Sequence, residues 1–413
     1  MERIILHSDL NNFYASVECL YRPELRDKPV AVAGNVENRH GIILAKNDHA
    51  KKFGVKTGEA IWEARNKCPG LVLVPPNFPL YLKISKLAQK IYSEYTDKVE
   101  PFGIDESWLD VTGSTRLYGD GPAIAEKIRQ RIKFELGITV SIGVSFNKIF
   151  AKLGSDMKKP DAITVITKGN YKDLVWPLPV DHLLYVGRAT AKQMHSHFVH
   201  TIGDLAQMQP DLLRSRHGKW GESLWIFANG LDCSPVAPTN SVSFIKSVGN
   251  STTCYRDLQN NHDVKIVLNA LSESVAMRLR EQGLKCKTVV INVRNKNLAS
   301  CDWQCKIPLP SNNAVGIADC ALDLFSKVYT WRSPIRSIGV RATDLIPADT
   351  PVQTDLFTDD RQRIKRENLD KTVDDLRRRF GFSCVKRGVV MQDLKYAGLN
   401  AKDNHTIHPH NYF

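Results

Sequence analysis

Three acidic residues from two distant segments are the side chains of this sequence best suited to chemistry. Asp9 stands near the end of the apolar segment 3–9, and the pair Asp105-Glu106 stands within the segment 99–111. Carboxylates that share one place repel each other unless a cation lies among them, and such hard oxygen ligands select Mg²⁺ or Mn²⁺. A divalent metal site is therefore expected if the fold brings the two segments together.

The order of the predicted elements does bring them together. The elements are, along the chain, a buried strand at 3–9, a helix at 80–95, short strands at 99–104 and 108–112, a helix at about 121–136 and a strand at 138–144. This β-α-β-β-α-β order predicts the ferredoxin-like split motif, whose first and second strands run parallel. The end of strand one and the turn between strands two and three then share one edge of the sheet. The alternative is that Asp105-Glu106 is a solvated hairpin tip and that Asp9 is a strand-end cap.

Length and composition set bounds on the class of protein. At 413 residues, 42% of them hydrophobic, the chain is long enough for several domains with packed cores. No segment is long and apolar enough to span a bilayer, and the N-terminus has no signal-peptide pattern, so a soluble cytoplasmic protein is expected. Nine cysteines without a CxxC pair indicate free thiols rather than disulfides or zinc. The net charge of +13 is a weak indication of a polyanionic partner.

Two basic segments flank the expected carboxylate site. The insertion of about seventy residues after the first strand carries lysines among small residues and glycines, at positions 46, 51, 52 and 56. This pattern suits a flexible lid that closes on phosphates, although a solvated basic helix is the simpler alternative. Residues 145–160, directly after the strand at 138–144, hold a second basic cluster. Together the two clusters indicate a substrate with a triphosphate.

Residues 167–235 show a different, helical pattern. Two short helices joined through the turn Val186-Gly187, followed by Thr201-Ile202-Gly203, resemble helix-hairpin-helix modules. Such modules offer backbone N–H groups to DNA phosphates without reading sequence. The alternative is an ordinary αα-hairpin. Residues 236–243, with two prolines and polar residues, have the composition of a linker.

A second β-α-β-β-α-β pattern is predicted over residues 244–346. Its elements are strands at 244–248, 287–294, 301–307 and 335–341 and helices at about 263–281 and 313–330. One side of the strand 287–294 holds Val289, Ile291 and Val293, and the other holds Thr288, Val290, Asn292 and Arg294. The first side is expected to be covered by helices, and the exposed, cationic side is expected to lie along a duplex backbone. The alternative is that the open face binds nothing.

Several motifs of this chain resemble those of Y-family translesion DNA polymerases of the bacterial DNA polymerase IV type. They are Asp-x-x-x-Phe-Tyr-Ala-Ser-Val-Glu from Asp9, Lys-Lys-Phe-Gly-Val-Lys from Lys51, Asp105-Glu106-Ser107, Ser-x-Asn-Lys-x-x-Ala-Lys from Ser145 and Asp-Met-x-Lys-Pro from Asp156. The resemblance runs from residue 1 to about 357 and implies an α+β, right-hand polymerase with two ferredoxin-like domains. Its implied parts are a palm at 1–10 and 78–166, fingers at 11–77, a thumb at 167–235, a little finger at 244–346 and a C-terminal tail at 347–413.

The resemblance also implies a reaction and its cofactors. Asp9, Asp105 and Glu106, with the backbone carbonyl of Leu10, would hold two Mg²⁺ ions, for which Mn²⁺ could substitute. The activity implied is the addition of deoxynucleotides to a primer 3′-hydroxyl opposite damaged or undamaged template, with low fidelity and no proofreading. One rival is a nucleotidyl cyclase-like palm enzyme. A second rival is a non-catalytic DNA-binding scaffold homologue, in which three clustered carboxylates would have no purpose.

Nucleotide-binding residues follow from the same resemblance. Tyr14 matches the steric-gate aromatic that excludes a ribose 2′-hydroxyl, and Phe13 would line the same pocket or simply pack beside strand one. Lys51 and Lys159 would neutralise the β- and γ-phosphates. The chain departs from the family pattern at Asn11, where many members have an aspartate, and at Ala45 and Asp48, where a small hydroxyl residue and a tyrosine are common. Lys51 itself replaces a frequent Arg, whose bidentate fork a lysine cannot reproduce.

Further sites implied by the resemblance contact DNA and a partner protein. Gly187 of the thumb and Arg294, Arg336 and Arg341 of the little finger would bind primer–template DNA. The segment Gln353-Thr354-Asp355-Leu356-Phe357 resembles the peptide that docks in the bacterial sliding clamp, with Gln353, Leu356 and Phe357 as its contact residues. The expected partners are therefore primer–template DNA, dNTP and the clamp, with no membrane and a monomeric chain.

The tail beyond the clamp motif has a helical pattern. Ile364, Leu369, Val373, Leu376 and Phe380 recur near helical spacing amid many charges, which suits a helix docking on the body or on another protein. The three histidines at 405, 408 and 410 indicate a disordered tail rather than a metal site.

Overall fold

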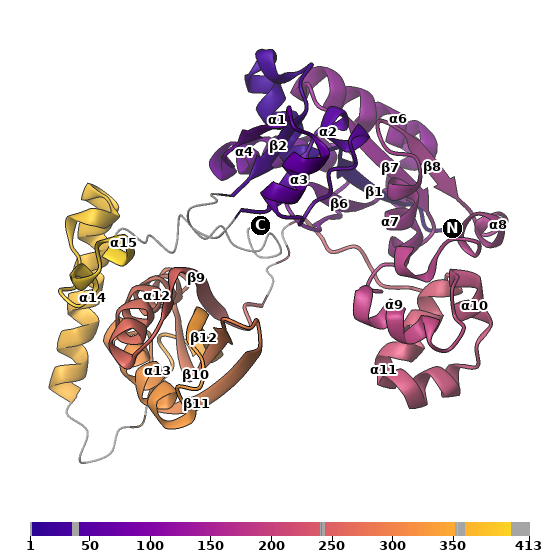
Figure 1. The fold of residues 1–413 in the computed structure, drawn as a ribbon. Helices are drawn as coiled ribbons and strands as arrows, with labels where there is room; N and C mark the ends of the chain where they lie inside the picture. Colours follow the sequence, from indigo (N-terminus) through magenta and orange to yellow (C-terminus); the bar gives the residue numbers. More distant parts are fainter. Residues whose placement is uncertain are drawn as a thin grey trace. The chain divides into compact units, whose positions relative to one another are not determined.

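The computed structural model describes residues 2–34, 41–239, 241, 244–351, 353 and 360–397 (Figure 1). The chain divides into two compact units, an N-terminal unit that holds nearly all described residues up to 241 and a C-terminal unit from 244 onward. Within the described residues, no helix is long and apolar enough to cross a membrane. All nine cysteines lie in the described part of the chain and are free thiols, as predicted.

A five-stranded sheet forms the centre of the N-terminal unit. Its strands, in spatial order, are β5 (Val99–Pro101), β6 (Glu106–Asp110), β1 (Ile5–Leu10), β7 (Val140–Ser145) and β8 (Ile163–Ile166). β1 runs antiparallel to β6 and β7, and β5 runs antiparallel to β6, so β1 and β5 run parallel with β6 between them. The first four strands therefore have the predicted split motif. The fifth strand, β8, pairs parallel with β7 and was not predicted.

The two faces of this sheet have different covers because side chains alternate along β1. Leu6 and Leu10 point into a hydrophobic core built with α4 (Phe78–Ser93) and α6 (Gly121–Arg131). Ile5, His7 and Asp9 point to the opposite face, where α7 (Lys148–Met157) packs. Gly143 of β7 permits this close packing, since a Cβ there would lie 1.9 Å from the carbonyl oxygen of Ala151. The carboxylate of Asp9 is therefore on the α7 face.

The insertion after β1 is a folded subdomain with its own core. Its elements are α1 (Phe13–Tyr21), β2 (Val30–Ala33), β3 (Ile43–Lys46), α2 (Asp48–Lys52), α3 (Ile61–Lys67) and β4 (Val72–Val74), with strand order β3-β2-β4. Ile43, Ala50 and Ala64 are fully buried in that core. The basic segment that the sequence indicates as a lid thus includes a strand and a capped helix, because Asn47 accepts a hydrogen bond from Ala50 N.

Helices form the last part of the N-terminal unit. They are α8 (Tyr171–Val175), α9 (Arg188–His195), α10 (Ile202–Gln207) and α11 (Pro210–Ala228), with a 3₁₀ turn at Val180–His182. The first helix of the predicted hairpin is reduced to that 3₁₀ turn. α11 contains a sharp kink at Gly218 (φ 64°), so it is two helices joined by a turn.

The C-terminal unit is a four-stranded antiparallel sheet covered by helices. Its elements are β9 (Val248–Leu258), α12 (Asn261–Glu281), β10 (Leu284–Asn295), β11 (Ser300–Ser311), α13 (Ala314–Val328) and β12 (Ile335–Pro347). The predicted element order is confirmed, but the first strand lies at 248–258 and not at 244–248. The strand order is β11-β10-β12-β9, so the second and fourth strands are central here, whereas the first and third are central in the N-terminal sheet.

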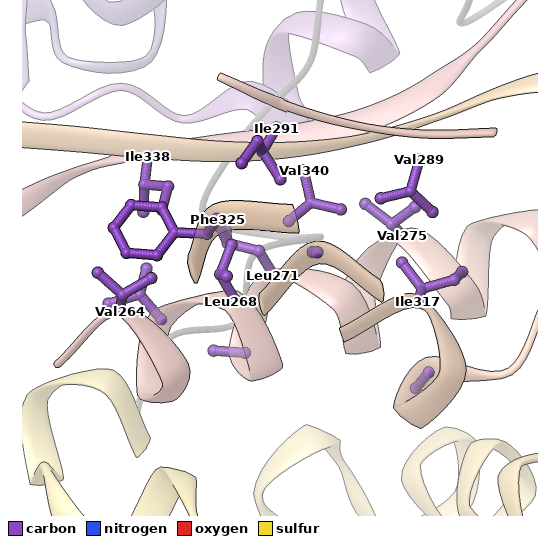
Figure 2. Close-up of a cluster of buried hydrophobic side chains, with 14 of the residues drawn as sticks. Val264, Leu268, Leu271, Val275, Val289, Ile291, Ile317, Phe325, Ile338 and Val340 are labelled. Carbon is purple, nitrogen blue, oxygen red and sulfur yellow. The ribbon is translucent and has the colours of Figure 1, made fainter. Parts of the chain in front are cut away.

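One face of this sheet is covered by α12 and α13, as predicted. Val289 and Ile291 of β10 pack against Leu268 and Leu271 of α12 and against Phe325 of α13 (Figure 2). All five side chains are fully buried. The period-two pattern of β10 thus has the expected consequence, with an apolar inner face and an opposite face without helices.

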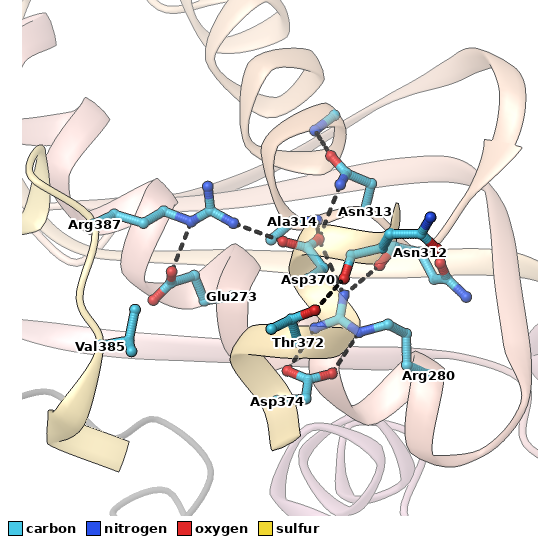
Figure 3. A network of polar contacts seen from close by, with 12 residues as sticks. Glu273, Arg280, Asn312, Asn313, Ala314, Asp370, Thr372, Asp374, Val385 and Arg387 are labelled. Atoms are coloured by element: carbon cyan, nitrogen blue, oxygen red, sulfur yellow. Dashed lines mark hydrogen bonds and ion pairs between the residues drawn. The ribbon is translucent and has the colours of Figure 1, made fainter. Parts of the chain in front are cut away.

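The C-terminal extension folds onto α12 and the start of α13. Helix α14 (Asp360–Phe380) presents Asp370 and Asp374 to Arg280, and Arg387 bridges Glu273 and Asp370 (Figure 3). Farther along, α15 (Leu394–Ala397) and the 3₁₀ turn before it bury Val390 and Tyr396 in the core of the sheet domain. Docking on the body, one of the two predicted options, is therefore confirmed.

The docking face of α14 is the opposite of the predicted one. Leu369, Leu376 and Phe380 are exposed, whereas Asp370 and Arg377 are buried. The reason is the surface that α14 meets: it carries the charged side chains of Glu273 and Arg280, which only an oppositely charged face can neutralise once water is removed.

Candidate active site

The strand register brings the three predicted carboxylates to one place. Asp9 lies directly opposite Glu106 in the antiparallel pair of β1 and β6, and the backbone N–H of Leu10 donates to the carbonyl of Asp105 at 2.9 Å. The predicted meeting of Asp9 with the acidic pair is thus confirmed. Asp9 is buried, so water cannot solvate its charge and another group must compensate it.

Two lysines that follow β7 neutralise these carboxylates. The ammonium of Lys152 lies 3.1 Å from Asp9 Oδ2 and 3.0 Å from Glu106 Oε2. The ammonium of Lys159 lies 2.7 Å from Asp9 Oδ2, and both lysines also contact Asp156. Lys159 was predicted as a site residue, and Lys152 was not, although it ends the Ser145–Lys152 motif. Only the packing of α7 on the face of the sheet that carries Asp9 reveals its position.

Protonation equilibria at the site are strongly perturbed. Burial, followed by the charges of Asp9 and Glu106, raises the pKa of Asp105 to about 7. Burial and the charge of Glu106 likewise raise the pKa of Asp9. Burial opposes the charged form of Lys152, but Asp9, Glu106 and Asp156 outweigh it and raise its pKa. Clustered carboxylates with raised pKa values are groups that a cation would stabilise.

The donor set suits a divalent metal ion although it is not arranged as a finished metal site. Among the described residues, no three acidic, histidine or cysteine side chains already form a group that could hold an ion. The lysine ammonium groups lie beside the carboxylates instead. Glu106 Oε2 is buried, and the ammonium of Lys152 lies 3.0 Å from it, so a divalent cation at this oxygen would have to displace that ammonium. Oxygen donors alone fit Mg²⁺ or Mn²⁺ and not a softer metal.

Aromatic rings line the exit of β1 beside the carboxylates. Tyr14 stacks on Tyr81 with ring centroids 4.6 Å apart and an interplanar angle of 9°, and the buried ring of Phe13 lies 5.8 Å from Tyr14. Burial and the negative charge of Asp105 raise the pKa of Tyr14 to about 12. Asn12, with φ 50°, makes the turn that starts α1 directly after the strand.

The positions that depart from the family pattern lie near this exit. Asp48 Oδ1 accepts a hydrogen bond from Asn12 Nδ2 at 3.0 Å, so it contacts the turn before Tyr14. Ala45 pairs with Val32 inside the small sheet. Lys51 is exposed on α2, and burial together with the nearby charge of Lys51 lowers the pKa of Lys46.

Two turns of the helical part present helix N-termini, and sequence reasoning found only one of them. Gly187, in the predicted turn, caps α9, and Tyr185 two residues before it has φ 72°. The second turn is at Gly218, before Lys219 and Trp220. The helical pattern of 210–228 conceals it, and the sequence signal that could have revealed it is the spacing of Gly218 and Gly221.

Two of the three predicted DNA-binding arginines lie on the open face of the sheet in the C-terminal unit. Arg294 pairs with Ser337 and Arg341 pairs with Val290, so both point away from the helices, and both are exposed. Arg336 lies at a bulge between Ile335 and Ser337 and does not belong to that regular face. Of the clamp-motif residues, Gln353 is exposed, whereas Leu356 and Phe357 lie outside the described residues.

Comparison with known proteins gives matches over nearly the whole chain. Residues 8–156 match the impB/mucB/samB family, and residues 245–356 match the C-terminal domain of that family. The DNA polymerase IV of Acetivibrio thermocellus is 56% identical over 400 residues, which cover 97% of this chain and 100% of the relative. DNA polymerase IV 1 of Bacillus subtilis is 37% identical and covers 94% of each chain. A solved Y-family DNA polymerase chimera of Dbh and Dpo4 shares the fold, with a TM-score of 0.74, 24% identity and coverage of 83% of this chain and 99% of the other.

Proposed function

We propose that this chain, which belongs to the Y family of translesion DNA polymerases (impB/mucB/samB), performs nucleotidyl transfer with Asp9, Asp105 and Glu106. The activity of the family is template-directed DNA synthesis on damaged DNA, and the chain is a DNA-directed DNA polymerase of the DNA polymerase IV type. Its domains are proposed as palm (1–10 and 78–166), fingers (11–77), thumb (167–235) and little finger (244–346). The register of Asp9 against Glu106 is the observation that supports the catalytic assignment most strongly.

The three carboxylates, with the backbone carbonyl of Leu10, are proposed to hold two divalent cations. When bound, these ions would lower the pKa of the primer 3′-hydroxyl and neutralise the triphosphate. The chain itself supplies positions and charges. Lys152 and Lys159 balance the acidic cluster, and their ammonium groups already lie within 3.1 Å of Asp9. A triphosphate beside the cluster would therefore find a cationic partner in Lys159 without a large movement.

Nucleotide selection is assigned to the two aromatic residues that follow β1, Phe13 and Tyr14. Tyr14 is fixed from below by its stack on Tyr81, so its ring cannot retreat from a sugar placed over it. A ribose 2′-hydroxyl would then meet the ring, and a deoxyribose would not. Phe13 is buried and supports this ring. Lys51, exposed on α2, is proposed to contact the outer phosphates from the fingers.

Primer–template DNA is proposed to contact the thumb turn at Gly187 and the open sheet of the little finger through Arg294, Arg341 and, less directly, Arg336. Both contacts would address phosphates, which makes binding independent of sequence and sensitive to salt. Gln353, Leu356 and Phe357 are proposed to bind the sliding clamp. Copying is expected to be of low fidelity and without proofreading, by a monomeric chain.

Primer extension by the purified full chain tests the catalytic assignment. Glu106→Gln and Asp105→Asn should each abolish extension, because a carboxamide cannot supply the negative charge that a divalent cation needs. Binding of primer–template DNA should remain close to that of the parent chain. Asp97→Asn, a change of an exposed acid outside the site, is the matched control and should extend normally. Extension by Glu106→Gln at the rate of that control would refute the assignment.

A further inference from the structure

Two aromatic rings lie half-exposed at the two turns of the thumb. Tyr185 precedes Gly187 and is 49% exposed, and Trp220 follows Gly218 and is 44% exposed. Their ring centroids are 5.6 Å apart in an edge-to-face arrangement, although 35 residues separate them in the sequence. They line one side of a hollow of about 300 Å³, whose other lining residues include Trp108, Lys148 and Phe227.

The backbone of Tyr185 adopts a strained conformation. Its φ of 72° lies in the left-handed region, which bulky residues rarely adopt and which glycine adopts freely. At the corresponding position of the second turn the chain has glycine, Gly218, with φ 64°. A glycine at 185 would therefore form the turn with less strain. Strain alone does not assign a role, since Phe198 also has a positive φ of 61°; at Tyr185, however, the strained residue carries a ring that lines the hollow.

The hollow adjoins the catalytic face of the palm. Trp108 follows Glu106 by two residues on β6, so both side chains point to the same face, about 6–7 Å apart along the strand. Lys148 precedes Lys152 by one turn of α7 and thus lies on the same side of that helix. A DNA strand whose 3′ end reaches the carboxylates can therefore pass the two rings with its preceding nucleotides.

The charges around the rings decide which part of a nucleotide faces them. Exposed Arg188 and Lys219 stand at the two turns, where backbone N–H groups also suit phosphates. Asp232 lies in the hollow itself, with its carboxylate hydrogen-bonded by Ser234 N and Oγ, and it would repel a phosphate. The ammonium of Lys148, which also lines the hollow, is already paired with Glu100 at 2.6 Å. The uncharged sugar and base are the parts that this hollow can accept.

We propose that Tyr185 and Trp220 form a platform that packs against the sugar and base of a primer-strand nucleotide just behind the primer terminus. The contact is independent of sequence, because every nucleotide of the primer strand presents the same apolar sugar edge, whereas the faces of its base are stacked on the neighbouring bases of the duplex. This proposal rests on the polymerase function proposed above and adds a DNA contact to it.

Equilibrium binding of a fluorescently labelled primer–template duplex, measured by anisotropy with the full chain, tests the platform. Tyr185→Gly relieves the left-handed strain and removes the ring, so the fold should be as stable as the parent or more so, and loss of the apolar contact with the sugar should raise Kd on the order of tenfold. Trp220→Leu should weaken binding similarly. Tyr185→Phe, which keeps the ring, should bind like the parent chain.

Phe198 offers a matched control. It has φ 61°, is 84% exposed and follows the C-terminal end of α9, whereas Gly187 caps the N-terminal end. Phe198→Gly thus removes an aromatic ring and the same kind of strain away from the proposed platform, and it should leave Kd unchanged.

The outcomes separate this proposal from the one on which it rests. If the parent chain extends primers but Tyr185→Gly and Trp220→Leu, with parental melting temperatures, bind DNA as tightly as Phe198→Gly, the platform is refuted and the polymerase function stands. If Tyr185→Gly unfolds, the ring is structural, and parental affinity of a folded Trp220→Leu would then overturn the proposal. A parent chain without DNA binding or extension would refute the proposed function itself.

Discussion

Replacing Asp370 by alanine should destabilise the little finger severely, because this single carboxylate joins three segments of the C-terminal unit. Its Oδ2 accepts from Asn313 Nδ2 at 2.9 Å and from Ala314 N at 2.8 Å, and Arg280 Nη1 lies 3.2 Å away. Its Oδ1 accepts from Arg387 Nη2 at 2.9 Å. The side chain is 3% exposed, so water cannot take over these contacts.

The expected loss of stability follows from the charged and polar groups that Asp370→Ala would leave without a partner. Removing one partner of a buried ion pair typically costs about 3–5 kcal/mol, since a charge is left without compensation. Arg280 retains Asp374 and Arg387 retains Glu273, which places the expected loss near the lower end, about 3 kcal/mol. The N–H of Ala314 at the start of α13 would also lose its acceptor, at about 1–3 kcal/mol, and this cost partly overlaps with the first. For a unit of this size the melting transition should fall by on the order of 10 °C.

Differential scanning calorimetry of the full chain measures this change, with hydrogen exchange of α13 and α14 to assign the transition to the C-terminal unit. Asp375→Ala is the matched control on the same helix, because among the described residues Asp375 forms an ion pair with Arg378 alone, at the exposed surface, and its loss should cost less than about 0.5 kcal/mol. Asp370→Asn, which keeps an acceptor but loses the charge, should fall between the two. A melting temperature of Asp370→Ala within 2 °C of the Asp375→Ala control would show that the buried network does not hold the extension in place.

Three further predictions concern the active site. The folded-state pKa of Asp105 is about 7 and its unfolded value is about 3.9, so the metal-free protein should lose stability as pH rises from about 4 through 7. Mg²⁺ competes with the proton for this carboxylate and should therefore bind more tightly as pH rises over the same range. Thermal melts with and without Mg²⁺ at pH 5.5 and 8 measure both effects, and an equal stabilisation by Mg²⁺ at the two pH values would contradict the prediction. Tyr14→Ala should raise ribonucleotide incorporation relative to deoxynucleotide incorporation by roughly 10–200-fold in single-nucleotide kinetics, with Tyr14→Phe unchanged; unaltered discrimination in the alanine variant would remove the steric-gate role. Lys51→Ala should raise KM for dNTP by about tenfold with little change in kcat, as expected for loss of one charged contact to phosphate; Lys52→Ala, its neighbour on α2, serves as the control, and parental KM and kcat in Lys51→Ala would exclude the assignment.

The carboxylate cluster could be predicted from sequence because it depends on strand order and on the alternation of side chains along a strand. The apolar segment around Leu6 and the two short strands beside Glu106 identify the split motif. The motif in turn determines that the end of β1 lies beside the turn that holds Asp105 and Glu106. Lys152 could not be placed in the same way. Its position depends on how closely α7 packs on Gly143, which is a property of the folded sheet and not of any local pattern.

The errors elsewhere have equally specific causes. The strand expected at 244–248 lies at 248–258, because the inward positions of β9 include the polar Asn250 and Thr252, which weaken the alternation of apolar residues. The turn at Gly218 was concealed by a helical pattern that continues on both sides of it. The predicted docking face of α14 was wrong, because apolar periodicity identifies a docking face only when the partner surface is apolar. The surface that α14 contacts carries Glu273 and Arg280.

The docked extension also sets where this domain can be cut when it is grafted onto another polymerase. The match to the C-terminal family domain ends at residue 356, which makes the end of β12 a tempting junction. A graft ending there would leave Glu273 and Arg280 facing solvent beside an uncovered apolar patch, because Val390 and Tyr396 supply part of the core. A graft that ends after α15 would instead retain the extension that covers that patch, and it should express as a folded domain.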